Sequence, residues 1–334
     1  MAMTRLELRM CRASKSFTDA VYAILTAAGR WDAPLWMLSG LSGMAFKLAV
    51  HRQLLSMSVT AYGTWGNEHF SALDNLGFYT ASDGGRTRHA TFPVYQQAAI
   101  PWIRDSLDQG MGVVYWVPEF GVIHGYDDED RVFYVQDGRT AESRVVLYDN
   151  LGLNETPFWD VEVIGDRVSI PLREQALGSL RQAWIDWNTP YKLLPDRSIA
   201  SGRAAYGHLI EALKSGGYDG WGACYILRSY EVSRTEIRDY LRELSGGCLP
   251  GLQEAAALYA ELSGVIAASL PAALPHVAES RSSRDSAPVA ELTQALAVAS
   301  GLEERAMAEL RLVTERYPDP LAGVLPRWGA HTPR

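Results

Sequence analysis

The feature that most constrains the fold is a block of strand-like segments with helical segments on both sides. Between residues 111 and 172, short runs rich in Val, Ile, Tyr, Phe and Trp alternate with turn residues. These runs are MGVVYWV, EFGVIHGY, RVFYVQD, SRVVLYD, FWDVEVIG and RVSIPL. Their short connections predict an antiparallel meander, because parallel strands need long crossovers. Helices before and after such a sheet define an α+β fold.

Helical periodicity is clear on both sides of the strand block. In SFTDAVYAILTAAGRW, either Ser16 or Thr18 can cap the start of a helix, and Gly29 can end it. The C-terminal half predicts helices over 172–187, 199–215, 218–230, 234–244, 251–269 and 288–316. A polar linker is expected at 276–288. We therefore expect an α+β domain over 1–190 and a helical region over 191–334.

Composition and charge exclude several classes of protein. The net charge is −8 and no stripe of Lys and Arg stands out, which argues against nucleic acid as a partner. Three cysteines without a C-x-x-C pair predict neither a disulfide framework nor a zinc site, so we expect no metal and no cofactor. We see no signal-peptide core and no run of about 18 apolar residues, and so expect a cytoplasmic protein without a membrane partner. Homo-oligomerisation is left open.

An acidic hairpin joins two of the strand-like runs, in the segment PEFGVIHGYDDED. Together with LSGLSGMAF, LDNLGF and SGRAAYGHLIEALKSG, this segment resembles the papain-like fold of the bacteriocin-processing (double-glycine) peptidases. It resembles more closely the N-terminal domain of the butirosin-biosynthesis acyltransferase family and its uncharacterised bacterial relatives. The resemblance covers roughly residues 10–270. It implies that the α+β domain is papain-like, with an N-terminal helix packed on the antiparallel sheet.

The resemblance also implies where catalytic residues should stand. Such enzymes place a cysteine at the start of the first core helix, a histidine on the sheet and an acid that orients the histidine. Spacing assigns these positions to Ser16, Glu119 and Asp137. A serine hydroxyl needs a strong base, and two neighbouring carboxylates repel each other, so the site is expected to be degenerate.

Each assigned residue also has an ordinary structural interpretation. Ser16 can be a helix N-cap, Asp137 a hairpin-turn residue and Glu119 a solvated residue at a strand end. Cys11 is the rival nucleophile, with His124 as its rival base. Strand alternation predicts that His124 faces away from Glu119, because the two differ in parity.

A group of aromatic and acidic residues is expected around the old active-site cleft: Trp65, Glu68, Trp116 and Tyr126, with Glu119. Aromatic walls with carboxylates suit a cationic or polyhydroxylated small molecule, although the same aromatics can simply be core residues.

These expectations lead to three hypotheses about function. The first is a degenerate papain-like protein that binds a small molecule or peptide in the relic active-site cleft without cutting it. The second is an active acyltransferase or amidase of natural-product or peptide metabolism, using Cys11 or Ser16. The third is a structural partner that acts through its C-terminal helices. If the chain is an enzyme, the resemblance implies a papain-like acyltransferase or hydrolase.

Overall fold

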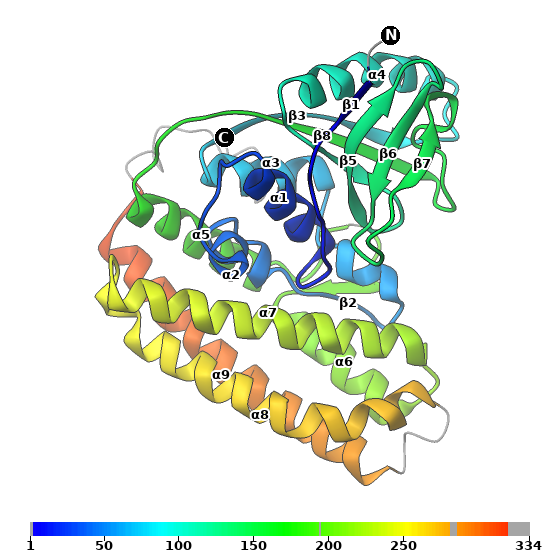
Figure 1. The fold of residues 1–334 in the computed structure, drawn as a ribbon. Coiled ribbons are helices and arrows are strands. Elements are labelled where there is room, and N and C mark those ends of the chain that lie inside the picture. Colours follow the sequence, from blue (N-terminus) through cyan, green and yellow to red (C-terminus); the bar gives the residue numbers. More distant parts are fainter. Residues whose placement is uncertain (1–2, 194, 281–285, 320–334) are drawn as a thin grey trace. The chain divides into compact units, whose positions relative to one another are not determined.

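The computed structural model describes residues 3–193, 195–280 and 286–319. The chain forms two compact units, each built from separate stretches of sequence (Figure 1). The first unit combines Met1–Leu38 with Leu76–Ser169, and the second combines Ser39–Asn75 with Ile170–Arg334. The first unit contains an antiparallel sheet with helices and the second is mainly helical, so the predicted α+β class is confirmed. The domain boundary at residue 190 stays a prediction.

The main sheet of the first unit has the strand order β3-β8-β4-β5-β6-β7, with β1 paired to β5. Its strands are β1 (Met3–Arg5), β3 (Phe78–Arg86), β4 (Val113–Trp116), β5 (Phe120–Asp127), β6 (Val132–Gln136), β7 (Arg144–Leu147) and β8 (Phe158–Arg167). Strands β4 to β7 form the predicted meander, but β8 returns to lie between β3 and β4. The predicted strand RVSIPL is wrong, because β8 ends at Arg167 and a helix begins at Leu172.

Helix α1 (Ser16–Ala27) packs on β4 and β5. The ring of Phe17 meets that of Phe120 edge-on, with centroids 5.8 Å apart. Helix α4 (Phe92–Asp108) contributes to the core on the opposite face, where its residues pack with strand residues of the other parity such as Ile123 and Val161. The sheet is thus covered on both faces, as its nearly continuous apolar strands require.

The start of α1 differs from the prediction. Lys15 is the N-cap, without a side-chain hydrogen bond, and Ser16 is the first helical residue. The carboxylate of Asp19 instead accepts hydrogen bonds from the backbone N–H groups of Ala13 and Ser14. The predicted capping by Ser16 or Thr18 is therefore wrong. The predicted end is confirmed, because Gly29 has φ +65° just after the helix.

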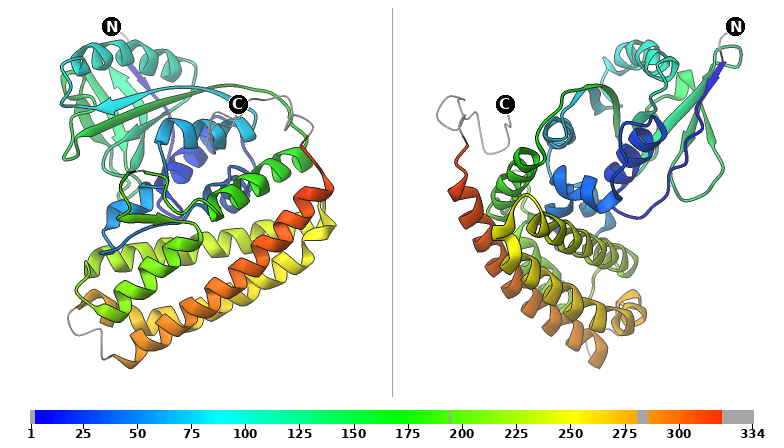
Figure 2. Two further views of the ribbon diagram at one scale, coloured as in Figure 1. Left: turned by 180° about the vertical axis from the view of Figure 1, so that it is seen from behind. Right: turned by 60° about the vertical axis from the view of Figure 1, so that its left-hand side comes forward.

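The second unit is a helical assembly with one small two-stranded sheet. Its antiparallel strands are β2 (Ala49–His51) and β9 (Ile199–Ser201). Its helices are α3 (Trp65–Asn75), α5 (Leu172–Trp187), α6 (Arg203–Ser215), α7 (Gly220–Gly246), α8 (Gln253–Ala278) and α9 (Ala287–Arg316). Helix α2 (Leu35–Leu41) joins the two units along the chain. Helices α7, α8 and α9 run alongside one another (Figure 2). The predicted helices 218–230 and 234–244 are one continuous helix, and the predicted helix 199–215 begins as β9.

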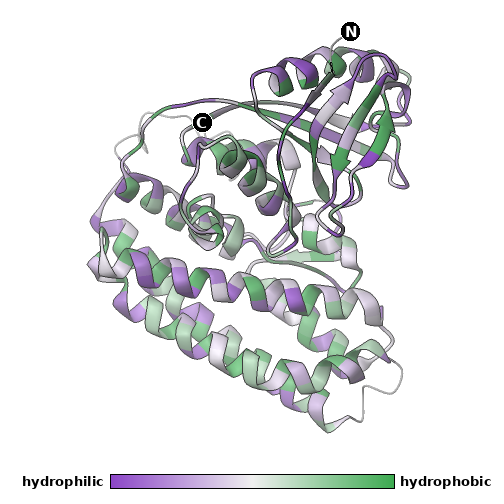
Figure 3. Ribbon diagram, in the orientation of Figure 1, coloured by the Kyte–Doolittle hydropathy of each residue, from purple (hydrophilic) through white to green (hydrophobic). Residues whose placement is uncertain are grey.

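One helical segment, Pro250–Ala278, is long and apolar enough to cross a bilayer. This corrects the expectation that no such segment exists. Hydrophobic residues run along the length of α8 (Figure 3), and Leu258, Leu262 and Ile266 are buried. A core helix of a soluble protein passes the same test, so the structure is compatible with a soluble protein.

The helical assembly contains a buried ion pair between α7 and α9. The guanidinium of Arg234 donates from Nη2 to both carboxylate oxygens of Glu303, at 2.9 and 3.0 Å. Tyr206 of α6 and Tyr259 of α8 also donate their hydroxyl hydrogens to Glu303. One carboxylate therefore joins four helices, and its side chain is fully buried.

Candidate functional site

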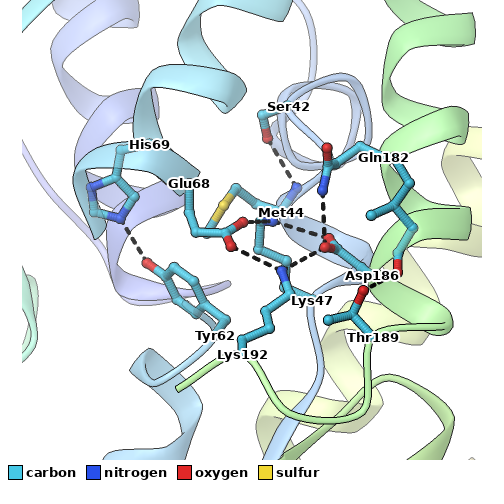
Figure 4. Close-up of polar contacts among 11 residues, drawn as sticks. Ser42, Met44, Lys47, Tyr62, Glu68, His69, Gln182, Asp186, Thr189 and Lys192 are labelled. Atoms are coloured by element: carbon cyan, nitrogen blue, oxygen red, sulfur yellow. Dashed lines mark hydrogen bonds and ion pairs between the residues drawn. The ribbon is translucent and has the colours of Figure 1, made fainter. Parts of the chain in front are cut away.

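The most concentrated buried charge in the second unit is a ring of two lysines and two carboxylates, here called the buried tetrad: Lys47, Glu68, Asp186 and Lys192 (Figure 4). Each ammonium contacts both carboxylates. Lys47 Nζ lies 3.0 Å from Asp186 Oδ2 and forms a short contact with Glu68, while Lys192 Nζ lies 2.9 Å from Glu68 Oε1. All four side chains are at most 4% exposed, and their formal charges sum to zero.

Four separate segments supply the tetrad. Lys47 follows the short 3-10 helix η1 (Met44–Phe46), and Glu68 lies in the first turn of α3. Asp186 lies in the last turn of α5, and Lys192 lies between α5 and β9. Gly63 makes room for the ring: a Cβ at this position would lie 2.2 Å from Glu68 Oε1, and its φ of +147° also favours glycine.

Asp186 and Lys47 stay ionised although they are buried. Burial alone would raise the pKa of Asp186, but the charges of Lys47 and Lys192 hold it well below its ordinary value. Burial would lower the pKa of Lys47, but Asp186 and Glu68 raise it above its ordinary value. Lys47 is therefore a permanent ammonium and cannot act as an amine nucleophile. The arrangement suits positioning of segments rather than proton transfer.

A tyrosine–histidine pair adjoins the tetrad. The Tyr62 hydroxyl lies 2.8 Å from Nε2 of His69 (Figure 4). Burial holds the pKa of His69 well below its ordinary value, so its ring is neutral at physiological pH. Tyr62, Lys47, Asp186 and Lys192 line a small pocket together with residues of the β9 end.

In the first unit, Arg12 links two of the predicted catalytic positions. Its Nη1 lies 3.4 Å from Oε2 of Glu119, and its Nε donates to the backbone carbonyl of Asp137 at 2.6 Å. The structure therefore brings Glu119 and Asp137 together, around a guanidinium that the sequence interpretation missed. Glu119 also has a positive φ of 76°, which is uncommon for a residue with a side chain.

Ser16 is not hydrogen-bonded to either of these carboxylates. Its side chain is buried at the start of α1, and within the described part of the chain its Oγ has no hydrogen-bond partner. The Oδ1 of Asp137 accepts from the backbone N–H of Arg139, as a turn residue does, and its other oxygen lies 3.8 Å from Arg144. No base is thus in hydrogen-bond contact with the Ser16 hydroxyl among the described residues.

In the rival pair, the Cys11 thiol is exposed and both ring nitrogens of His124 have hydrogen-bond partners. Cys11 is an exposed free thiol. His124 contacts the Leu6 carbonyl through Nδ1 at 3.2 Å and the Ser143 hydroxyl through Nε2 at 2.8 Å. An irregularity in the β5–β6 pairing falls between Ile123 and Gly125, so the strict alternation used to orient His124 is wrong at this point.

The predicted ligand-binding aromatics have separate surroundings. Trp65 Nε1 donates to the Thr60 carbonyl, and Trp116 Nε1 donates to Thr156. The Tyr126 hydroxyl donates to Asp108 of α4, within the core on the α4 face.

Trp116 packs edge-on with Phe120, which contacts α1. Trp116 and Tyr126 therefore lie on opposite faces of the sheet. Glu68, the remaining member of the group, belongs to the tetrad of the second unit. A ligand-binding role for these four residues stays a prediction.

Two further buried acids escaped the sequence interpretation. Asp160 and Glu162 lie on one face of β8, within the apolar run FWDVEVIG, and are 5% and 1% exposed. Burial, together with the charges of Glu162 and Asp83, raises the pKa of Asp160 well above its ordinary value. Burial raises the pKa of Glu162 to about 8. The sequence itself contains the signal for this acidic pair, since two acids at i and i+2 in an apolar strand must lie on the same face of the sheet.

We predict that Glu162→Gln stabilises the protein at neutral pH. A carboxyl whose folded pKa is raised favours its protonated form, so its contribution is fully present below the unfolded pKa and is lost as pH rises toward 8. The wild type should lose on the order of 3 kcal/mol between pH 4.5 and 7 through this group, and the glutamine variant should not. Urea unfolding at pH 5 and pH 8 measures the difference.

The exposed Glu155→Gln change is the control for this experiment and should leave the pH dependence unaltered. An identical pH slope for the wild type and Glu162→Gln would contradict the raised pKa.

Neither the protein-family models nor the curated proteins contain a match to this chain.

Proposed function

We propose that this chain is a cytoplasmic papain-like-fold protein, related to the N-terminal domain of the butirosin-biosynthesis acyltransferases. It binds a small molecule or peptide in a relic active-site cleft without hydrolysing it. Helix α1 packed on an antiparallel sheet supports the papain-like assignment, as does the GYDD hairpin between β5 and β6. The relation itself rests on the sequence resemblance.

The observation that carries the non-hydrolytic part of the proposal is the pairing of Glu119 with Arg12. A serine hydroxyl has a pKa far above 7 and reacts only when a base takes its proton. The resemblance assigns the base position to Glu119, but its carboxylate faces a guanidinium, and Ser16 Oγ has no hydrogen-bond partner among the described residues. A serine hydroxyl without a base in contact is not activated for acyl transfer.

The cysteine route gains no comparable support. Both ring nitrogens of His124 already have partners, and Cys11 is exposed with no base in contact among the described residues. A catalytic thiol is normally activated by a neighbouring histidine or cation.

We predict that serine-directed acylating probes do not modify Ser16. The test is intact-protein and peptide mass spectrometry after incubation with a fluorophosphonate and with an activated thioester. An exposed Cys11 should react with thiol reagents only at the rate of a free thiol, and His124→Ala should leave that rate unchanged.

Two results would overturn the proposal. One is stoichiometric modification of Ser16 that Glu119→Gln abolishes. The other is rapid modification of Cys11 that His124→Ala abolishes. Either would establish an acyl-transfer site.

A further inference from the structure

A second pocket of the second unit lies between the two-stranded β2–β9 sheet and α6. Its cavity volume is about 330 Å³, and it is lined by Arg52, Arg197, His208, Glu211, Ala212 and Ser215. This volume lies within the range of small-molecule sites, which begins near 300 Å³. None of these residues belongs to the buried tetrad.

The antiparallel pairing of β2 with β9 brings the backbones at Arg52 and Arg197 near each other. The backbone N–H of Arg52 donates to the Ser198 carbonyl at 2.9 Å, continuing the pairing of β2 with β9. Asp196 accepts from the N–H and the hydroxyl of Ser198, at 2.7 and 2.9 Å. These bonds order the turn that carries Arg197. Backbone hydrogen bonds therefore fix the chain at both arginines.

Helix α6 supplies the opposite wall. Nδ1 of His208 lies 3.1 Å from the Val50 carbonyl, which joins the helix to β2. Since a carbonyl only accepts, Nδ1 carries the hydrogen of this bond. Glu211, one turn further along, adds a carboxylate to the same lining.

The pocket therefore offers guanidinium donors on one side and a carboxylate acceptor on the other. Within the described residues, neither Arg52 nor Arg197 lies within ion-pair distance of a carboxylate, although the charge of Arg52 acts on the nearby Asp196 and Arg197 stacks over the ring of Tyr191. Burial and the charge of Arg52 lower the pKa of His51, and the charge of Asp196 opposes this change. Guanidinium groups bind carboxylates and phosphates through two parallel hydrogen bonds, whereas a carboxylate such as Glu211 binds an ammonium.

We propose that this pocket binds a small zwitterion, whose oxyanion meets Arg52 and Arg197 and whose ammonium meets Glu211. The pocket includes none of the relic active-site positions Ser16, Glu119 and Asp137, so the proposal goes beyond the proposed function and names the chemistry of a separate ligand. It uses no residue of the first unit. Labelling of Ser16 would therefore overturn the non-hydrolytic function and leave this pocket untouched.

Isothermal titration calorimetry at low ionic strength tests the proposal with two matched pairs of probes. O-Phosphoethanolamine is compared with ethyl phosphate, and β-alanine with propionate, so that each pair differs in its amine. At least one zwitterion should bind saturably, and its partner without the amine should bind about fivefold more weakly or worse. The two pairs separate a phosphate ligand from a carboxylate ligand.

Variants then assign the two ends of the ligand. Arg52→Gln and Arg197→Gln should each weaken binding about tenfold or more, because each removes a charge-assisted hydrogen bond. Glu211→Gln should remove the preference for the zwitterion and should strengthen binding of the probe that lacks the amine. Arg203→Gln is the matched control. Arg203 is an exposed arginine of α6, the helix that carries Glu211, and it lies 3.9 Å from Glu304. The Arg203→Gln variant should bind the zwitterion as the wild type does.

The proposal is overturned if neither zwitterion binds saturably to the wild type. It is also overturned if Arg203→Gln weakens binding as much as Arg52→Gln, or if Glu211→Gln keeps the preference for the amine. Thermal melting of each variant identifies any variant that has lost its fold. For Glu211→Gln the expected result is a higher affinity for the probe without the amine, and a misfolded protein would not show such an increase.

Discussion

Replacing Glu303 by glutamine is expected to lower the free energy of unfolding by about 3–5 kcal/mol, the range found when one partner of a buried ion pair is removed. Glu303 is fully buried and accepts from Arg234, Tyr206 and Tyr259. Burial raises the pKa of both tyrosines, so they keep the hydrogens that they donate. An amide in place of the carboxylate leaves the Arg234 charge without compensation, in contact with the Tyr230 ring.

Urea unfolding followed by the helical circular dichroism signal measures this loss. Glu254→Gln is the matched control, because Glu254 forms an exposed pair with Arg305 at 3.7 Å and should change stability by less than about 0.5 kcal/mol. The double variant Arg234→Met, Glu303→Leu removes both charges and should recover most of the loss. A loss below about 1 kcal/mol for Glu303→Gln would contradict a desolvated ion pair at this position.

Local patterns predicted the elements whose ends are marked in the sequence. Helix Leu172–Trp187 has the predicted bounds, because apolar residues recur at helical spacing along it. The split predicted within α7 failed because Ser233 looks like a break. Its hydroxyl instead donates to the Tyr230 carbonyl inside the helix.

The pairing of strands that are far apart in sequence could not be predicted from local patterns. The meander from β4 to β7 follows from short connections, but the return of β8 to lie beside β4 joins residues far apart in sequence. The position of β3 as the partner of β8 was likewise missed, because its glycine-rich end, SDGGR, resembles a turn.

The buried tetrad could not be predicted for a related reason. Lys47 lies 139 residues from Asp186, and isolated lysines and aspartates in a sequence are most often surface residues. The sequence interpretation includes Glu68 as a residue of a ligand-binding cleft with aromatic walls, not as a member of an ion-paired group. The family pattern assigns the base position to Glu119, where the family has a histidine. It gives no partner for a glutamate at this position, so it does not point to Arg12.

We predict that Asp186→Asn lowers the free energy of unfolding by about 3–5 kcal/mol at pH 7, since it leaves Lys47 and Lys192 facing the single carboxylate of Glu68. The folded pKa of Asp186 is depressed, so its contribution is present above the unfolded pKa and is lost as pH falls through the lower folded pKa. The variant should therefore lose less stability on acidification below about pH 4 than the wild type does.

A double-mutant cycle decides whether the ring acts as one unit. Lys47→Met alone leaves an excess negative charge, whereas Lys47→Met combined with Asp186→Asn restores neutrality with one lysine facing one carboxylate. We expect the double variant to be more stable than the sum of the single changes predicts, by about 1–3 kcal/mol, in urea unfolding at pH 7. Additive losses within about 0.5 kcal/mol would mean that the four charges act independently. The segments carrying Lys47 and Lys192 would then be held by their surrounding packing rather than by charge.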